Sequence, residues 1–289
     1  MSVQKVNPLA IQTGDYLLKF NGRTLVMGIL NVTPDSFSDG GLFLNKNEAV
    51  KKGIALADEG ADIIDVGGES TRPGADPVSL QEELERVIPV ITELADSVDV
   101  PISVDTYKSE VAKEAISAGA SLINDISGLR FDEEMATLAA EKKVPVVLMH
   151  IKGSPRDMQL DPHYDNMLEE IKNYLSDSIK IGTEAGIDKD KIIIDPGIGF
   201  GKKIEDNFEL IKNLGYFRAL GHPILVGPSR KSFLWKTLSV SPNDTLDATA
   251  AAVTASILFG ADIVRVHDVT GISGAIKIAD LIANAAEVN

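Results

Sequence analysis

Polar residues follow several short apolar runs of this chain, and their side chains suit a flat heterocycle and an anion. These residues are Asn31, Asp65, Asp105, Asn124, His150, Asp195, Ser229, Arg230, Lys231, Arg265 and His267. Carboxylates and carboxamides can form paired hydrogen bonds with a heterocycle that has an amidine-like N–H edge and a lactam edge. Arg265 and His267 lie two residues apart on one expected strand, so they project to the same side. With Lys231 they could bind a pyrophosphate, whose oxygens would hold Mg²⁺ together with one neutral protein oxygen.

The elements that must position these residues are eight short runs rich in Ile, Val and Leu. Continuous apolar runs of this length are typical of parallel strands that are buried on both faces. The runs cover residues 25–30, 63–67, 102–104, 122–126, 146–149, 192–194, 224–227 and 263–266.

Amphipathic segments separate the runs. Helices are expected at 50–61, 109–118 and 166–185, and another after the capping pair Ser79 and Glu82, with Pro89 expected to kink it. Strands that alternate with helices predict an α/β fold, a single (β/α)8 TIM barrel forming one domain over residues 1–289. A doubly wound open sheet fits less well, because no GxGxxG motif follows the first strand.

One six-residue template occurs three times, at 60–65, 119–124 and 260–265. Each copy starts with a glycine that should end a helix, and each places a polar residue at the same offset of an apolar strand: Asp65, Asn124 and Arg265. A polar group inside a barrel costs free energy unless it is paired or used. A structural hydrogen-bond network would explain one such residue, but three near the strand ends favour a ligand site. For Asp65 itself both interpretations stay open.

Two long loops follow the first two expected strands, at 31–41 and 67–75. Both are rich in Gly, Pro, Ser and Asp, which is typical of irregular backbone. Both exceed the roughly 2–6 residues usual for this kind of connection. We therefore expect them to close over substrate and exclude water rather than to be ordinary turns.

Composition excludes several classes of site and partner. With 28 Lys and Arg against 43 Asp and Glu, the net charge is −15, so the chain lacks the positive field needed for nonspecific binding of nucleic acid or anionic membranes. The sequence has no Cys, which excludes thiolate chemistry, and its four His lack metal-binding spacing. Residues 1–18 show no signal-peptide pattern, and the uncharged stretch 248–261 is too short to span a bilayer. We expect a cytoplasmic protein in which 248–261 forms a buried helix.

Eight segments, in this order, resemble those of the dihydropteroate synthases, a family of pterin-binding barrels. They are MGILNVTPDSFSDGG (27–41), IIDVGGESTRPGA (63–75), ISVDTYK (102–108), INDISG (123–128), LMH (148–150), IIDPGIGFGK (193–202), VGPSRKS (226–232) and RVHDV (265–269). The resemblance implies a (β/α)8 barrel and a transferase of folate biosynthesis. That enzyme condenses 6-hydroxymethyl-7,8-dihydropterin diphosphate with 4-aminobenzoate, giving 7,8-dihydropteroate and pyrophosphate. It also implies a homodimer formed through outer helices of the barrel, and a sulfonamide target.

The resemblance also implies roles for individual residues. Those that would bind the pterin are Asp105, Asn124, Asp195, Lys231 and Arg265. Those that would bind the diphosphate are Asn31, Arg72, Arg265 and His267, with Asn31 as the one protein ligand of Mg²⁺. Those that would line the aminobenzoate pocket are Phe37, Thr71, Pro73 and Ser232. Catalytic roles would fall to Lys231, Arg265 and Asp35, the last by stabilising cationic character on the reacting methylene.

Two other functions use a similar barrel. One is a pterin-binding methyltransferase module that acts with a corrinoid partner, and the other is a pterin-binding protein without catalysis. The methyltransferase module would not need the loops at 31–41 and 67–75 or the segment SRKS, all of which are present, and the intact anion site argues against both alternatives. Of the histidines, His150 is expected to be a structural hydrogen-bonding residue, and His163 and His222 are expected to be solvated.

Overall fold

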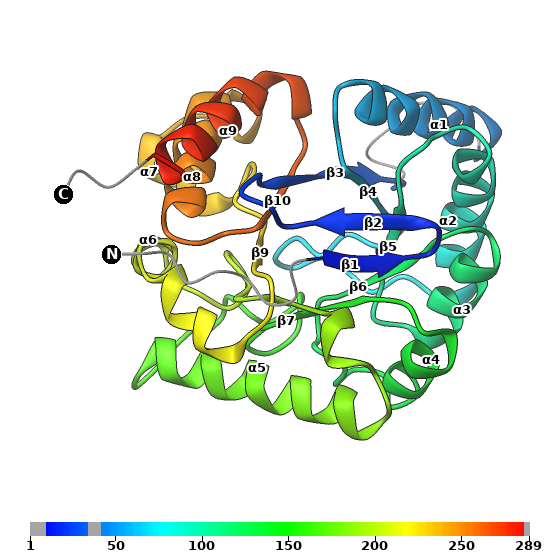
Figure 1. Cartoon of the computed structure of the whole chain (residues 1–289), viewed down its shortest axis with the longest axis horizontal. Helices are drawn as coiled ribbons and strands as arrows, with labels where there is room; N and C mark the ends of the chain where they lie inside the picture. Colours follow the sequence, from blue (N-terminus) through cyan, green and yellow to red (C-terminus); the bar gives the residue numbers. More distant parts are fainter. Residues whose placement is uncertain (1–9, 34–41, 286–289) are drawn as a thin grey trace.

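A closed parallel sheet forms the centre of the molecule. The computed structural model describes residues 10–33 and 42–285. Its parallel strands are β3 (Leu25–Asn31), β4 (Ile63–Gly67), β5 (Ile102–Asp105), β6 (Leu122–Asp125), β7 (Val146–Met149), β8 (Ile192–Asp195), β9 (Leu225–Val226) and β10 (Ile263–Val266). Their hydrogen-bonded order is β8-β7-β6-β5-β4-β3-β10-β9. A parallel bridge from Ile194 of β8 to Ile224, just before β9, joins the two outer strands. The predicted (β/α)8 barrel is thereby confirmed (Figure 1).

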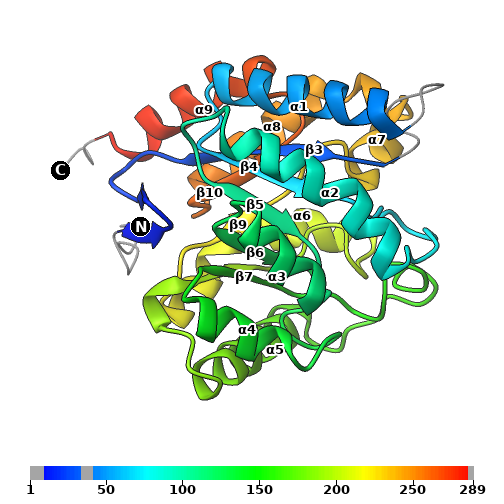
Figure 2. The same cartoon turned by 90° about the vertical axis from the view of Figure 1, so that its right-hand side faces the viewer.

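Helices surround this sheet (Figures 1 and 2). They are α1 (Leu42–Asp58), α2 (Leu80–Ala95), α3 (Ser109–Ser117), α4 (Met135–Lys142), α5 (Met167–Glu184), α6 (Ile204–Lys212), α7 (Ser232–Leu238), α8 (Leu246–Leu258) and α9 (Val269–Ala283), with short 3₁₀ helices η2 (Lys189–Lys191), η3 (Leu214–Leu220) and η4 (Pro242–Asp244). In the described part of the chain, no helix has both the length and the apolar character to cross a membrane.

Side-chain alternation along each strand separates the apolar residues into an outer and an inner cluster. In β4, Ile64 and Val66 belong to the outer cluster, which also contains Val87 of α2. Ile63 belongs to the inner cluster, at the amino-terminal end of the barrel. Asp65, two residues further along, therefore also faces inward. The barrel interior is apolar at one end and becomes polar toward the carboxyl ends of the strands.

An antiparallel hairpin that was not predicted covers the amino-terminal end of the barrel (Figure 1). Its strands, β1 (Ala10–Thr13) and β2 (Tyr16–Lys19), pair Ile11 with Leu18. Both side chains are buried in the inner cluster. The Thr13 hydroxyl donates a hydrogen bond to the Ser121 carbonyl, at 2.7 Å. The hairpin thus seals the apolar end and leaves the opposite end as the mouth.

Local signals set several helix boundaries. The Ser79 hydroxyl accepts a hydrogen bond from the Glu82 backbone N–H at the start of α2, and Asn166 caps α5 in the same way. Pro89 lies inside α2, which continues to Ala95. The expected strand 224–227 is reduced to the two residues of β9. The expected buried helix near 248–261 is present as α8.

Candidate active site

An ion-pair network centred on Arg265 forms the floor of the barrel mouth. The Arg265 guanidinium donates from Nε to Oδ2 of Asp65 at 2.5 Å and from Nη2 to Oδ2 of Asp105 at 2.6 Å. The Asn124 amide donates to the same Oδ2 of Asp65 at 2.9 Å. Strands β4, β5, β6 and β10 thus each contribute one member. The network fixes the orientation of Asp105 and Asn124 before any ligand arrives.

This network answers the question that the sequence left open about Asp65. The side chain is fully buried, and one of its oxygens accepts from both of the other residues at the repeated offset, Asn124 and Arg265. Asp65 therefore acts as an internal acceptor beneath the mouth. The repeated six-residue template that favoured a ligand site reflects, at this position, a hydrogen-bonded floor.

Asp195 ends β8 and is oriented by the loop that follows it. Its Oδ1 accepts a hydrogen bond from the Gly197 backbone N–H at 2.7 Å. Gly197 has φ +75°, and a Cβ at this position would lie 1.9 Å from the His150 carbonyl oxygen. Only glycine can fill this position, because both the backbone angle and the close approach exclude a side chain.

A buried lysine that the sequence analysis did not single out holds the same loop. The Lys202 side chain, in a residue only 2% exposed, donates to the Gly197 carbonyl at 2.8 Å and the Phe200 carbonyl at 3.1 Å. Its ammonium also lies 3.0 Å from Nδ1 of His150, which confirms the structural role predicted for that histidine. A lysine is seldom fully buried without partners, and its position in a glycine-rich motif was the available signal.

Lys231 reaches the mouth from the segment between β9 and α7. Its ammonium lies 3.8 Å from the centroid of the Phe200 ring, a distance typical of a cation–π contact. Gly199 leaves room for the lysine stem, since a Cβ there would lie 2.9 Å from Cδ of Lys231. Phe200 is therefore a further residue of this site that sequence reasoning missed.

Burial shifts the titration of the ionisable groups in the mouth toward neutral pH. It raises the pKa of Asp105 to about 7, although Arg265 opposes the shift. It raises the pKa of Asp195 to about 6, opposed by the hydrogen bond from Gly197. It lowers the pKa of Lys231 to about 8, to which the nearby Arg265 charge adds. Shifted acids and bases in one cleft are characteristic of functional sites.

Positive groups gather on the side of the mouth near His267. Burial lowers the pKa of this histidine to about 3, and further lowering comes from the charges of Arg230, Arg265, Lys231 and Arg72. Nδ1 of His267 lies 3.0 Å from the Ser229 hydroxyl. Arg230 is paired with Asp268 at 2.9 Å. The predicted cations Arg265, Lys231 and Arg72 thus act on one histidine, which stays neutral and could donate or accept a hydrogen bond.

Asn31 is the last residue of β3 and lies half-buried at the mouth. In residues 10–33 and 42–285, no group of three or more His, Cys, Asp or Glu could hold a metal ion. A carboxamide oxygen is an acceptable Mg²⁺ ligand, but this ion keeps most of its shell from water and phosphate oxygens. The donor set therefore fits an ion that arrives with a diphosphate.

The predicted aminobenzoate residues lie on separate elements. Thr71 and Pro73 belong to the loop between β4 and α2, and Ser232 begins α7. The backbone N–H of Gly74 donates to the Pro155 carbonyl at 3.1 Å, so this loop contacts the loop that follows β7. The predicted residues Asp35 and Phe37 lie outside the described residues.

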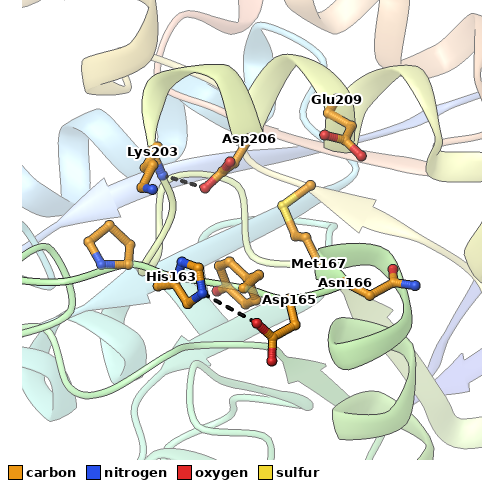
Figure 3. Close-up of a pocket in the computed structure, with 9 residues that line it drawn as sticks. His163, Asp165, Asn166, Met167, Lys203, Asp206 and Glu209 are labelled. Atoms are coloured by element: carbon orange, nitrogen blue, oxygen red, sulfur yellow. Dashed lines mark hydrogen bonds and ion pairs between the residues drawn. The ribbon is translucent and has the colours of Figure 1, made fainter.

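The remaining two histidines, His163 and His222, differ in burial. His163 is exposed, as predicted, whereas the prediction for His222 is wrong, because that side chain is buried. His163 lines a surface pocket of about 280 Å³ between the segment before α5 and the start of α6 (Figure 3). The pocket is lined by Pro162, His163, Tyr164, Asp165, Asn166, Met167, Lys203, Asp206 and Glu209. It contains none of the predicted site residues.

Comparisons with known proteins agree with this geometry. The model of the pterin binding enzyme family matches residues 27–267. A dihydropteroate synthase of Synechocystis is 46% identical over 274 residues, covering 94% of this chain and 95% of that protein. One of Bacillus subtilis is 47% identical over 279 residues, covering 96% and 95%. The structure of Xanthomonas albilineans dihydropteroate synthase with 4-aminobenzoic acid superposes with a TM-score of 0.90 at 42% identity, covering 96% of this chain and 99% of that one. The chain belongs to the dihydropteroate synthase family of pterin-binding enzymes.

Proposed function

We propose that this protein condenses 6-hydroxymethyl-7,8-dihydropterin diphosphate with 4-aminobenzoate, giving 7,8-dihydropteroate and pyrophosphate in folate biosynthesis. The observation that carries this assignment is the Arg265 network. It presents Asp105 and Asn124 at the mouth of a barrel of this family, on the same side as the shifted groups Asp195 and Lys231.

The pterin ring would bind on this floor. Asp105 and Asp195, once ionised, can accept N–H bonds from its amidine-like edge, and Asn124 can both donate and accept. The Arg265 guanidinium would lie against the ring face. Lys231 would complete the pterin site and face the diphosphate, because its ammonium lies against the Phe200 ring and interacts electrostatically with Arg265 and Asp195.

The reaction needs help mainly with its leaving group. Positive charge from Arg265, Lys231 and Arg72, with a hydrogen bond from His267, would stabilise departing pyrophosphate. Conjugation of the methylene with the electron-rich dihydropterin makes a loose, cation-like transition state reasonable, and Asp35 would stabilise that cation. The attacking arylamine is already neutral at neutral pH, so the site requires no strong general base.

We propose Mg²⁺ as the metal, with Asn31 as its one protein ligand. Bound there, the ion would neutralise charge on the leaving pyrophosphate. What supports this is the neutral oxygen at the end of β3 together with the cationic groups around His267, which suit a diphosphate as the source of the other oxygens.

The aminobenzoate would bind between Thr71, Pro73, Phe37 and Ser232, after the loops at 31–41 and 67–75 close. Water is the competing nucleophile at the reacting methylene. Closure would therefore exclude water from the cation-like methylene and would also position the amine.

We further propose a homodimer, formed through helices on the outside of the barrel. In its support, α9 exposes three large apolar side chains within five residues: Ile278 is 57% exposed, Leu281 61% and Ile282 55%. Contiguous exposed apolar residues are typical of interaction surfaces. Light scattering would test the dimer. The cytoplasmic location expected from the sequence remains a proposal, to be tested by cell fractionation.

The assay that tests the function is pyrophosphate release from the pterin diphosphate with and without 4-aminobenzoate. We expect release that depends on the amine. A corrinoid methyltransferase module would instead move a folate methyl group, and a binding protein without catalysis would release no pyrophosphate under either condition.

A further inference from the structure

The base of the loop between β4 and α2 contains a carboxylate that contacts both ends of the loop. Glu69 lies two residues after β4, and Val78 lies two residues before α2. Oε2 of Glu69 accepts a hydrogen bond from the Val78 backbone N–H at 3.3 Å. One side chain thus joins positions nine residues apart, and between them lie Thr71 and Arg72.

Two side chains that follow β5 hold this carboxylate. The Lys108 ammonium contacts Oε2 of Glu69 at 2.5 Å, and the Tyr107 hydroxyl donates to Oε1 at 2.8 Å. The same ammonium contacts Oε2 of Glu83 on α2, also at 2.5 Å. Arg86 of α2 donates to the Gly68 carbonyl at 2.6 Å. The loop base is therefore tied both to α2 and to the segment before α3.

Burial makes these contacts costly to break. The side chains of Glu69, Glu83 and Lys108 are 8%, 1% and 19% exposed. Removing one member of a buried ion pair leaves an uncompensated charge, whereas an exposed pair contributes little. Burial would lower the pKa of Lys108, but the hydrogen bonds that its ammonium donates to both carboxylates outweigh this effect and raise the pKa, so the ammonium stays charged at neutral pH.

The tip of the same loop is held much less. Arg72, Pro73 and Gly74 are exposed, and within the described residues the backbone hydrogen bond from Gly74 to Pro155 is the one that joins the tip to another segment. A fixed base with an exposed tip lets the tip approach a ligand without releasing the whole loop. Because the base is already fixed, the loop loses less conformational entropy when it closes.

We infer that Glu69 is a positioning residue for the second substrate: its carboxylate, held by Lys108 and Tyr107, clamps the two ends of the β4–α2 loop and thereby places Thr71, Arg72 and Pro73. This inference rests on the proposed function for the identity of that substrate. Glu69 itself makes no contact with the floor residues Asp105 or Arg265 among the hydrogen bonds of the described chain. The clamp should therefore act on 4-aminobenzoate and, through Arg72, on the diphosphate, but not on the pterin ring.

The test compares Glu69→Gln with wild type and with Glu85→Gln, a matched control on exposed α2 surface where Glu85 contacts Gln81. For Glu69→Gln we expect the KM for 4-aminobenzoate to rise about tenfold, since the weakened clamp removes about 1.4 kcal/mol of preorganisation. The Kd of the bare hydroxymethyl pterin, which has no diphosphate to contact Arg72, should stay within about twofold, because the floor is separate. Lys108→Arg, which can still bridge two carboxylates, should stay near wild type, and Glu85→Gln should change neither quantity.

Equal losses for both ligands, or an unchanged KM, would overturn the clamp. If Glu69→Gln fails to fold, Tyr107→Phe removes one hydrogen bond and should raise the KM about two- to threefold without changing the pterin Kd. Hydrogen exchange of the backbone N–H groups of the non-proline residues in 70–78 gives a readout independent of turnover. Faster exchange in Glu69→Gln supports the clamp, and unchanged exchange overturns it. Wild type that binds pterin but shows no amine-dependent turnover would instead count against the proposed function.

Discussion

Arg265 and Asp65 form an ion pair of 2.5 Å although they are 200 residues apart in the sequence. The pair joins β10 to β4 beneath the barrel mouth, and Asp105 shares the same guanidinium. Two carboxylates thus hold one arginine in place. A group with this much prior orientation needs little reorganisation when substrate binds, which is the condition for effective electrostatic stabilisation.

Replacing Arg265 by alanine should weaken binding of the pterin diphosphate more than binding of the bare hydroxymethyl pterin. Both affinities should fall, because Asp65 and Asp105 lose their partner, but the diphosphate ligand also loses a charged hydrogen bond. We expect an additional loss of about tenfold or more for that ligand. Calorimetry with the two ligands measures the difference. Equal losses would restrict Arg265 to the floor of the site and remove its role toward the anion.

Asp195→Asn should reduce pterin affinity by about 2–3 kcal/mol, because one buried acceptor becomes a donor that faces the N–H groups of the ring. The stability of the fold should change less, since Oδ1 can still accept from Gly197. Asp165→Asn, at a fully exposed carboxylate, is the matched control and should leave affinity unchanged. If calorimetry finds the same pterin Kd for Asp195→Asn and wild type, Asp195 does not bind the ring.

Binding of the bare pterin should strengthen as the pH rises from about 5.5 to 8. Burial raises the pKa of Asp105 to about 7 and that of Asp195 to about 6, so both are substantially protonated at the acid end and cannot accept two N–H bonds. Ionisation on binding should release protons. Calorimetry in buffers of different ionisation enthalpy measures that release, and a pH-independent Kd without proton release would contradict the assignment.

Binding of the diphosphate should weaken again at higher pH. Burial lowers the pKa of Lys231 to about 8, so its positive charge is lost above that value. In Lys231→Arg, which keeps its charge, this alkaline decline should disappear or move to higher pH. Pyrophosphate affinity between pH 7 and about 9.5 gives the comparison, and the same decline in both proteins would assign it to another group.

The barrel could be predicted because buried parallel strands leave a local signature. Every strand of the barrel was located, and the residues at the strand ends met at one mouth. The hairpin of β1 and β2 was not predicted, because its apolar residues, such as Ile11 and Leu18, are buried by packing against residues of the inner cluster that are distant in the sequence. The hydrogen-bond partners of Asp65 could not be predicted either. The sequence indicated that Asp65 faces inward, but not that Arg265 and Asn124 both donate to one of its oxygens. Burial of His222 depends on how the surrounding loops pack, and no local sequence pattern indicates that packing.

Sulfonamides, which mimic 4-aminobenzoate in this family, should bind tightly only when pyrophosphate and Mg²⁺ are present. The positive groups around His267 include Arg72 of the loop 67–75. A bound anion would relieve the repulsion between these groups and draw the loop inward. The two ligands must then strengthen each other by the same factor. Phe37→Leu should change sulfonamide affinity and spare that of the pterin. Equal sulfonamide affinity with and without pyrophosphate would show that the pocket is formed in advance.

We propose that the site couples loss of pyrophosphate to attack by the arylamine rather than by water. The most direct test quantifies pyrophosphate, 7,8-dihydropteroate and 6-hydroxymethyl-7,8-dihydropterin in one reaction, with and without 4-aminobenzoate. We predict equal amounts of pyrophosphate and dihydropteroate when the amine is present, and almost no pyrophosphate when it is absent. Pyrophosphate released at the same rate without the amine, together with the hydroxymethyl pterin, would contradict the account.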